Sequence, residues 1–237
     1  MWSGVLPAIR TCARVAVTAL LACGLLASCY LPDRFEAEIR LTKDGGYGVA
    51  FIGQLVYAPL YGKIAKKEIT PEKAEADTKM ILEQLKRDTA FKEVTSLGRG
   101  RYQVRFDREG RFGGAMQMVN FATRNQAIFR IRTTETGLIQ VNGSGQGGLY
   151  ADRFKEIGLT TQGLVRIVTD VEVLEHNATF VRASRTPGFT QYDWRIRSFK
   201  DPPPKFIGRL AIDPRTGVPA YRGGAVNVDG VDEKEKE

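Results

Sequence analysis

The stretch that decides the fold is FEAEIRL at residues 35–41, followed by KDGG at 43–46 and YGVAFIGQLVY at 47–57. Apolar and charged residues alternate with period two in the first segment, which is typical of a half-buried strand. Asp-Gly and Gly-Gly supply the positive φ angles that tight turns need at little steric cost. The third segment is apolar on both faces. Together the three segments predict an antiparallel β-hairpin at the start of the folded domain.

Outward from this hairpin, strand patterns dominate and one helix stands out. Further strands are predicted at 101–107, 127–133, 138–142, 164–175 and 191–199. The helix is predicted at 71–88, because Thr70 can cap it, Pro71 suits its first position and an apolar stripe follows. A second, shorter helix is predicted at 149–157. We therefore expect an α+β domain with a mainly antiparallel sheet, either open or barrel-like.

The N-terminal segment has the three parts of a bacterial export signal. Arg10 and Arg14 form its basic part, and Val15–Leu26 is an apolar run. This run is shorter than the roughly 20 residues of a membrane span. The sequence Leu26-Ala27-Ser28-Cys29 then matches a lipobox, in which Cys29 would carry the lipid. An uncleaved N-terminal anchor and an ordinary cleaved signal are the alternatives.

The lipobox sets the expected organisation and location of the chain. We expect a signal peptide at 1–28, a lipid-anchored leader at 29–34, one domain at 35–222 and a disordered charged tail at 223–237. Processing would remove Cys12 and Cys23, so the mature domain would have no disulfide. The net charge would fall from +8 to +6 with the loss of Arg10 and Arg14. Because residue 30 is not aspartate, we expect an outer-membrane lipoprotein that faces the periplasm. An inner-membrane location is the less favoured alternative.

Motifs that suggest chemistry have simpler interpretations. Gly143–Gly148 matches G-x-G-x-x-G, but the expected hairpins around it argue against a dinucleotide site and for a flexible loop. His176 is the only histidine, so a zinc set is not expected. Asp170 and Glu172 are predicted on the solvent face of one strand. The sequence thus predicts no catalytic residue, metal, cofactor or nucleic-acid partner.

Arginines recur on the polar faces of the predicted strands. They are either solvated or, where strands are neighbours, part of one basic surface that contacts anionic head groups. The second interpretation concerns Arg130, Arg132, Arg166, Arg195 and Arg197, with Arg101 and Arg105 as further members of the pattern. The strands also carry an apolar set, which forms either a filled core or a cavity for an acyl chain such as palmitate. This set is Phe51, Leu55, Tyr57, Phe106, Phe129, Ile131, Tyr192, Trp194 and Ile196.

Two segments resemble a known family. VRIVTDVEVLEHNA at 165–178, followed by QYDWRI at 191–196, resembles the LppM-like bacterial lipoprotein domain. The matching positions are Thr169, Asp170, Asn177 and Trp194, and the resemblance implies that they are architectural. It also implies a lipid-binding α/β type of fold without enzymatic activity. The helix at 70–90, the glycine-rich loop and the charged tail depart from the family pattern.

Three functions follow from these observations. The first is a non-enzymatic module that binds a lipid or amphipathic ligand at the cell envelope, anchored to the membrane by its N-terminal lipid. The second is a structural or assembly partner of another envelope protein, with exposed strand edges as its contact surface. The third is a hydrolase of envelope polymers. It is the weakest of the three, because no nucleophile, metal set or acid–base pair stands out.

Overall fold

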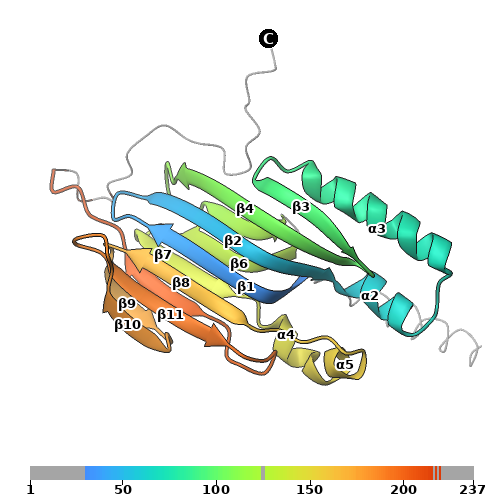
Figure 1. Cartoon of the computed structure of the whole chain (residues 1–237). Coiled ribbons are helices and arrows are strands. Elements are labelled where there is room, and N and C mark those ends of the chain that lie inside the picture. The colour runs from blue at the N-terminus through green and yellow to red at the C-terminus, as the bar shows by residue number, and fades with distance from the viewer. Residues whose placement is uncertain (1–29, 124–125, 216, 218, 220–237) are drawn as a thin grey trace, which may run out of the picture.

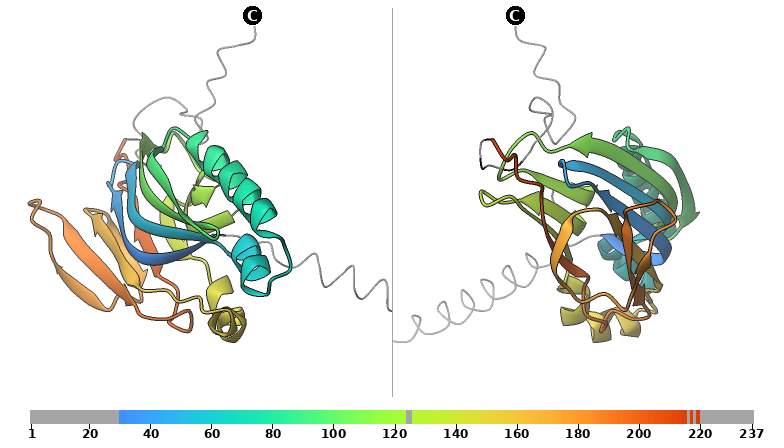
Figure 2. Two further views of the ribbon diagram at one scale, coloured as in Figure 1. Left: turned by 45° about the vertical axis from the view of Figure 1, so that its right-hand side comes forward. Right: turned by 90° about the vertical axis from the view of Figure 1, so that its left-hand side faces the viewer.

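The computed structural model describes residues 30–123, 126–215, 217 and 219. The predicted signal peptide, the lipobox with Cys29 and the tail at 223–237 lie outside the described residues. Two β-sheets stack face to face, with a long helix at one side (Figures 1 and 2). The α+β class is confirmed. The barrel-like alternative is wrong, because the strands form two separate sheets and no closed barrel.

The larger sheet has seven strands in the order β10-β11-β8-β1-β2-β4-β3. Their bounds are β1 (Tyr30–Leu41), β2 (Gly46–Tyr57), β3 (Phe91–Gly98), β4 (Arg101–Arg111), β8 (Gly163–Thr169), β10 (Phe180–Ala183) and β11 (Thr190–Ile196). The smaller sheet has the order β5-β6-β7-β12-β9. Its strands are β5 (Met118–Thr123), β6 (Gln126–Thr133), β7 (Leu138–Gly143), β9 (Glu172–His176) and β12 (Lys205–Arg209).

The predicted hairpin is confirmed as β1 and β2, which pair antiparallel from Tyr30–Tyr57 to Leu41–Tyr47. The strand β1 begins at Tyr30, so residues 30–34 belong to the folded domain and do not form the predicted leader. Tyr30 and Leu31 are both buried. These two residues precede the alternating segment, so the sequence pattern did not include them. Their burial follows from packing against neighbouring elements.

A β-bulge at Arg34 resets the phase of β1. The register with β2 shifts between Asp33 and Glu36, and Arg34 has a left-handed φ of 46°. Before the bulge Tyr30 faces the space between the sheets, and after it Phe35 does so. An extra residue in one strand changes which side chains face inward. This explains why the alternation read from the sequence starts at Phe35.

The predicted strand at 164–175 is wrong, because the chain leaves the larger sheet at Asp170. Residues up to Thr169 form β8, and residues from Glu172 form β9 in the other sheet. The Thr169 hydroxyl donates to the Leu41 carbonyl and accepts from the Val171 amide, while Asp170 accepts from the Lys43 amide at 2.7 Å. These bonds fix the crossing. Alternation continues through the break, so the sequence pattern does not reveal it.

The predicted helix is confirmed as α3 (Pro71–Lys86), with Thr70 accepting from the Lys73 amide at its start. The predicted helix at 149–157 is present as two short helices, α4 (Gln146–Leu149) and α5 (Ala151–Glu156). The helix α2 (Ala58–Ala65) was not predicted, because it continues directly from β2. Strands β3, β5, β10 and β12 were also not predicted. Strand β10 is exposed at all four residues, so no alternation marks it.

Aromatic side chains fill the space between the sheets. Phe121 of β5 contacts Phe51 of β2 and Phe106 of β4, with ring centroids 4.7 and 4.8 Å apart. The same face of β4 is covered farther along by α3, where the Tyr102 hydroxyl donates to the Thr78 carbonyl. The smaller sheet and α3 therefore cover one face of the larger sheet together, with Ile81 and Leu85 in the same core. Most of the predicted apolar set is filled core.

Candidate ligand-binding site at the end of the sandwich

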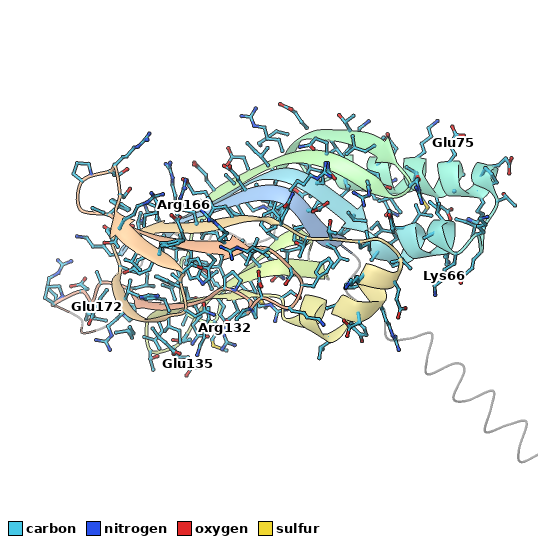
Figure 3. All side chains as sticks on the ribbon, turned by 60° about the horizontal axis from the view of Figure 1, so that its bottom comes forward. Lys66, Glu75, Arg132, Glu135, Arg166 and Glu172 are labelled. Atoms are coloured by element: carbon cyan, nitrogen blue, oxygen red, sulfur yellow. The ribbon has the colours of Figure 1, made fainter. Side chains whose placement is uncertain are left out.

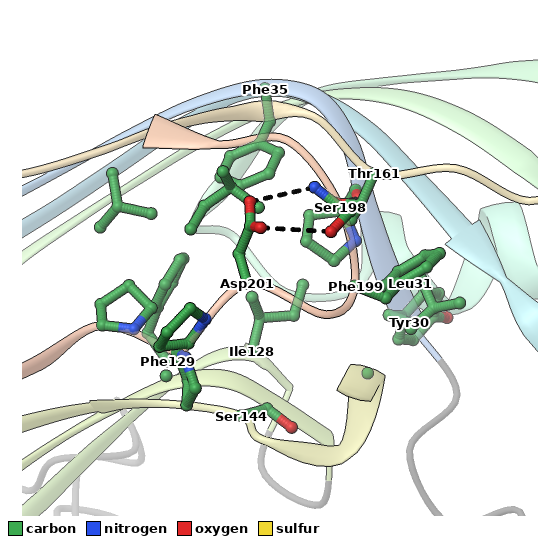
Figure 4. A pocket seen from close by; sticks show the side chains of 18 residues that line it. Tyr30, Leu31, Phe35, Ile128, Phe129, Ser144, Thr161, Ser198, Phe199 and Asp201 are labelled. Atoms are coloured by element: carbon green, nitrogen blue, oxygen red, sulfur yellow. Dashed lines mark hydrogen bonds between the residues drawn. The ribbon is translucent and has the colours of Figure 1, made fainter. Parts of the chain in front are cut away.

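A cavity of about 90 Å³ lies between the two sheets at one end of the sandwich (Figure 4). Its apolar wall is formed by both layers: Tyr30, Phe35, Val165 and Ile196 come from the larger sheet, and Ile128 and Phe129 from the smaller one. The wall is predominantly apolar with a few polar groups, as in most ligand pockets. The cavity lies between the sheets, and α3 does not line it.

Phe35 of β1 and Gly163, the first residue of β8, shape this cavity. Phe35 pairs with Gly163, and Gly163 pairs with Ile196, so the three residues form one row across the sheet. A Cβ at Gly163 would lie 2.5 Å from the Phe35 carbonyl oxygen and from its ring. Glycine therefore allows the aromatic ring to lie over the β8 backbone. Phe35 also stacks on Phe51 at 5.5 Å, which holds the ring in the cavity wall.

The rim of the cavity is a loop closed by Asp201. Its carboxylate accepts a bond from the backbone amide of Arg197 at 2.6 Å. It also accepts from the Ser198 amide at 3.1 Å and from the Ser198 hydroxyl, as Figure 4 shows. The Arg197 amide bond is the main cause that lowers the pKa of Asp201. This carboxylate is therefore charged and engaged in holding the loop, which is a structural role and not an acid–base role.

The volume of the cavity limits what it can hold. An engineered cavity of about 150 Å³ lined by apolar side chains binds benzene. At about 90 Å³, this cavity accommodates the end of an apolar chain and not a whole acyl chain. The sequence left open whether the apolar set forms a filled core or a lined cavity. The structure shows a filled core with a small cavity at one end.

A second hollow, a groove of about 580 Å³, lies at the same end of the larger sheet. Arg34, Arg195 and Arg197 line it, and Glu36 is the acidic residue among its lining side chains. Phe35 and Ile196 line both hollows: the cavity lies on the inner face of the larger sheet and the groove on its outer face, so the strand ends of this sheet separate them. We call these three arginines the arginine triad. Arg34 was not a predicted site residue, and only its place at the break in the alternation could have singled it out.

The structure does not bring the five predicted arginines onto one surface. Arg130 and Arg132 lie on β6 of the smaller sheet, whereas Arg166 and Arg195 lie on β8 and β11 of the larger one. Figure 3 shows Arg132 and Arg166 on different layers. The prediction of one basic surface is therefore wrong. It is wrong because the exposed side chains of two sheets stacked face to face lie on opposite outer faces and point away from each other.

The arginines outside the triad have local partners. Arg130 donates to the Asn120 amide oxygen at 3.4 Å, and Arg132 donates to that of Gln140 at 2.8 Å. Arg166 donates to Asp193, which is 5% exposed and also accepts from Arg182. These contacts hold neighbouring strands together. Only Arg195 and Arg197 of the predicted set line the groove.

The glycine motif and the lone histidine have structural roles. Gly143–Gly148 joins an antiparallel strand to a helix of four residues, which is not the parallel arrangement of a dinucleotide fold. His176 Nδ1 accepts from the Ala178 amide, and the ring packs edge-on against Tyr192 at 4.9 Å. In the described part of the chain, no three His, Cys, Asp or Glu side chains are placed to hold a metal ion.

Asp170 and Glu172 do not lie on one strand. Asp170 lies in the crossing between the sheets, and Glu172 on β9 pairs with Arg209 at 3.3 Å. Asp170 belongs to no strand and Glu172 belongs to β9, so the prediction that the two residues share a strand face is wrong. The family-motif residues instead join elements together. The Trp194 indole donates to the Asn177 amide oxygen at 2.7 Å, and this oxygen also accepts from the Lys205 amide.

Comparisons with known proteins add little to this geometry. No protein-family model and no curated protein matches the sequence. Among solved structures, the chain is similar to the NMR structure of the Mycobacterium tuberculosis LppM folded domain, with a TM-score of 0.35 and 8% identity. The match covers 82% of this chain and 98% of that chain. This is the family that the sequence motifs resemble, but a TM-score this low supports no transfer of function.

None of the described helices is long and apolar enough to cross a membrane.

Proposed function

We propose that the protein is a non-enzymatic bacterial lipoprotein of the cell envelope that binds an anionic amphipathic ligand at the end of the sandwich. The lipid on Cys29 would hold it at the periplasmic side of the outer membrane. The observation that carries the binding proposal is the adjacency of the apolar cavity and the arginine triad, which share Phe35 and Ile196. The end of an apolar chain would occupy the cavity, and an anionic head group would reach around the ends of β8 and β11 to contact the triad.

The triad suits an anionic head group because guanidinium groups bind phosphate oxygens through two parallel hydrogen bonds. Within the described residues, no ion pair engages Arg34 or Arg195. Arg195 lies over the exposed Phe180 ring at 5.9 Å, a contact that leaves its donors accessible. The groove thus offers donors where the cavity offers apolar surface.

The head-group contact is tested with short-chain lipids. We expect a protein comprising residues 30–237 to bind dioctanoyl phosphatidylglycerol more tightly than dioctanoyl phosphatidylcholine in isothermal titration calorimetry. The double variant Arg195→Gln, Arg197→Gln should bind the anionic lipid at least about tenfold more weakly, since each lost charge-assisted hydrogen bond is worth over about 1 kcal/mol. The matched control is Arg130→Gln, Arg132→Gln on the other sheet. Equal losses in both double variants would contradict the proposal.

The apolar contact is tested by filling the cavity. Ile196→Trp adds volume inside the cavity wall and should abolish binding of the dioctanoyl lipid. Leu174→Trp, at an exposed position of β9, is the control. Circular dichroism of both variants separates lost binding from lost folding. Unchanged lipid affinity in a folded Ile196→Trp variant would show that the cavity is not the site.

An edge strand supports the alternative function as an assembly partner. Strand β10 is the last strand of the larger sheet, and its Phe180 and Val181 are 55% and 49% exposed. An exposed apolar edge can pair with a strand of another protein. Crosslinking in intact cells from position 180 tests this function, and recovery of one specific envelope protein, lost when Val181→Pro is added, would favour it over lipid binding.

A further inference from the structure

The helices α2, α4 and α5 gather at the end of the molecule where β1 begins (Figure 1). A small second core holds them there: Leu31 of β1 packs with Tyr61 of α2, Phe154 of α5 and Leu159. We call this part of the surface the helical end. The cavity opens beside it, because Tyr30, Gly147 of α4 and Phe199 are among its lining residues.

The helical end is basic. Its exposed cations are Lys63, Lys66, Lys67, Arg99, Arg153 and Lys155, with Lys200 beside them. Fewer exposed carboxylates accompany them: Glu68 lies 4.0 Å from Lys66, Asp152 lies 2.8 Å from Lys200, Glu156 ends α5, and Glu72 lies in the first turn of the neighbouring α3. Arg99 is held at this end by its position 5.6 Å over the Tyr61 ring. Cations therefore outnumber carboxylates, and their side chains point to solvent.

One large apolar side chain projects from this basic surface. Leu149, the last residue of α4, is 80% exposed, the highest value of any large apolar residue that the structure describes. Exposed leucine among lysines and arginines is the pattern of surfaces that rest on membranes, where the apolar group enters the interface and the cations face anionic head groups.

The tether reaches the same end. Tyr30 is buried and paired with Tyr57, and Cys29 precedes it directly. Adjacent Cα atoms are about 3.8 Å apart, so an acyl group on Cys29 holds the start of β1 at the lipid surface. An uncleaved apolar segment at Val15–Leu26 would reach the same place through a few residues.

We propose that the helical end docks on an anionic bilayer, with Leu149 in the interface and the surrounding cations against the head groups. This inference rests on the membrane anchor of the proposed function. The cavity mouth then faces the lipid surface, and a chain end passes between bilayer and cavity without crossing the solvent. The far edge, with β9 and β10, faces away from the membrane. In Figure 3, Lys66 and Glu172 mark the two ends.

The test places a tryptophan at each end of the full chain, reconstituted in lipid nanodiscs. Leu149→Trp reports on the helical end, and Leu174→Trp on the far edge is its matched control. Brominated phosphatidylcholine quenches tryptophan that enters the bilayer interface, and the signal of the parent chain is subtracted. We expect quenching at position 149 and none at 174, increasing when the nanodiscs contain phosphatidylglycerol. Lys66→Gln with Lys67→Gln should reduce the quenching at 149 in those nanodiscs.

The outcomes separate this inference from the proposed function. No quenching at 149 in a chain that stays on the nanodisc overturns docking and leaves the anchor intact, as does equal quenching at both positions. A chain that does not associate with nanodiscs overturns the anchor itself. Loss of quenching on adding salt supports docking through charge, because salt screens exposed pairs. Folding of each variant is checked by near-ultraviolet circular dichroism of the buried Trp194.

Discussion

Asp44 shows how one side chain fixes the turn of the central hairpin. Its carboxylate accepts from the Thr42 hydroxyl and pairs with Arg111 of β4 at 2.7 Å. The bond from Thr42 and then the contact with Arg111 lower the pKa of Asp44 to about 2. The turn residues were recognisable from the sequence as Asp-Gly-Gly. Arg111, 67 positions away, was not, because only the pairing of β2 with β4 brings it there.

Asp44→Asn should remove a pH-dependent part of the stability. A lowered pKa stabilises the folded state above the unfolded value of about 3.9, and the contribution is lost as the pH falls through about 2. We expect the variant to be less stable by about 1 kcal/mol at pH 7, since solvent screens this partly exposed pair, and the difference to shrink toward pH 2. Thermal melts across this range measure it. Asp107→Asn, at an exposed position of β4, is the control; a pH-independent difference for Asp44→Asn would contradict the assignment.

At the scale of elements, α3 completes the cover of the larger sheet. Thr78, Ile81 and Leu85 form its buried face, as the period of its apolar residues predicted. The sequence did not predict which surface of the protein this helix face would contact. It packs on β3 and β4, where the Tyr102 hydroxyl donates to the Thr78 carbonyl at 3.1 Å. Burial is the main cause that raises the pKa of Tyr102 to about 12, so the hydroxyl keeps its proton and its bond.

Tyr102→Phe tests this contact between helix and sheet. The variant keeps the ring and loses the hydroxyl, so we expect a loss of about 1 kcal/mol in the free energy of unfolding. Hydrogen exchange should also become faster in α3 than in the strands far from it. Tyr150→Phe, where the hydroxyl is not in the sheet–helix contact, serves as the control. An unchanged unfolding free energy together with unchanged exchange in α3 would refute the role of this bond.

At the scale of the whole molecule, the two sheets form one core. Phe121 of the smaller sheet contacts Phe51 and Phe106 of the larger one, and Phe206 of β12 contacts Tyr192 of β11 at 5.5 Å. The chain passes from the larger to the smaller sheet after β4, again at Asp170 and a third time after β11. Neither sheet can bury its inner face alone, so the sheets should fold and unfold together.

Phe121→Ala measures this coupling. Removing a fully buried aromatic ring should cost about 3–5 kcal/mol, because it leaves a cavity between the layers. Denaturant unfolding, followed by far- and near-ultraviolet circular dichroism, should remain a single transition at a lower midpoint. Phe180→Ala at the exposed edge should change stability by less than about 0.5 kcal/mol. Two separate transitions in the parent chain would show that the sheets are independent.

The sequence by itself determined the local features. The hairpin at 35–57 and the helix α3 follow from alternation, turn chemistry and capping, which act between residues a few positions apart. The expected location of the protein rests on the sequence alone, since the predicted lipobox lies outside the described residues. The sequence also argued against a zinc set at the single histidine and against a dinucleotide site at the glycine motif, although the expected flexible loop at 143–148 overlaps the short helix α4.

Only the tertiary structure decided which distant residues meet. It broke the predicted strand at 164–175 between two sheets and separated Arg130 and Arg132 from Arg195 and Arg197. It also placed Arg34 beside that second pair and opened the cavity where β1, β6 and β8 begin. Alternation predicts which side chains of a strand face the core. It does not predict which strand of the other sheet those side chains will contact. The candidate site is made of such cross-layer neighbours, so its residues became visible only when the sheets were stacked.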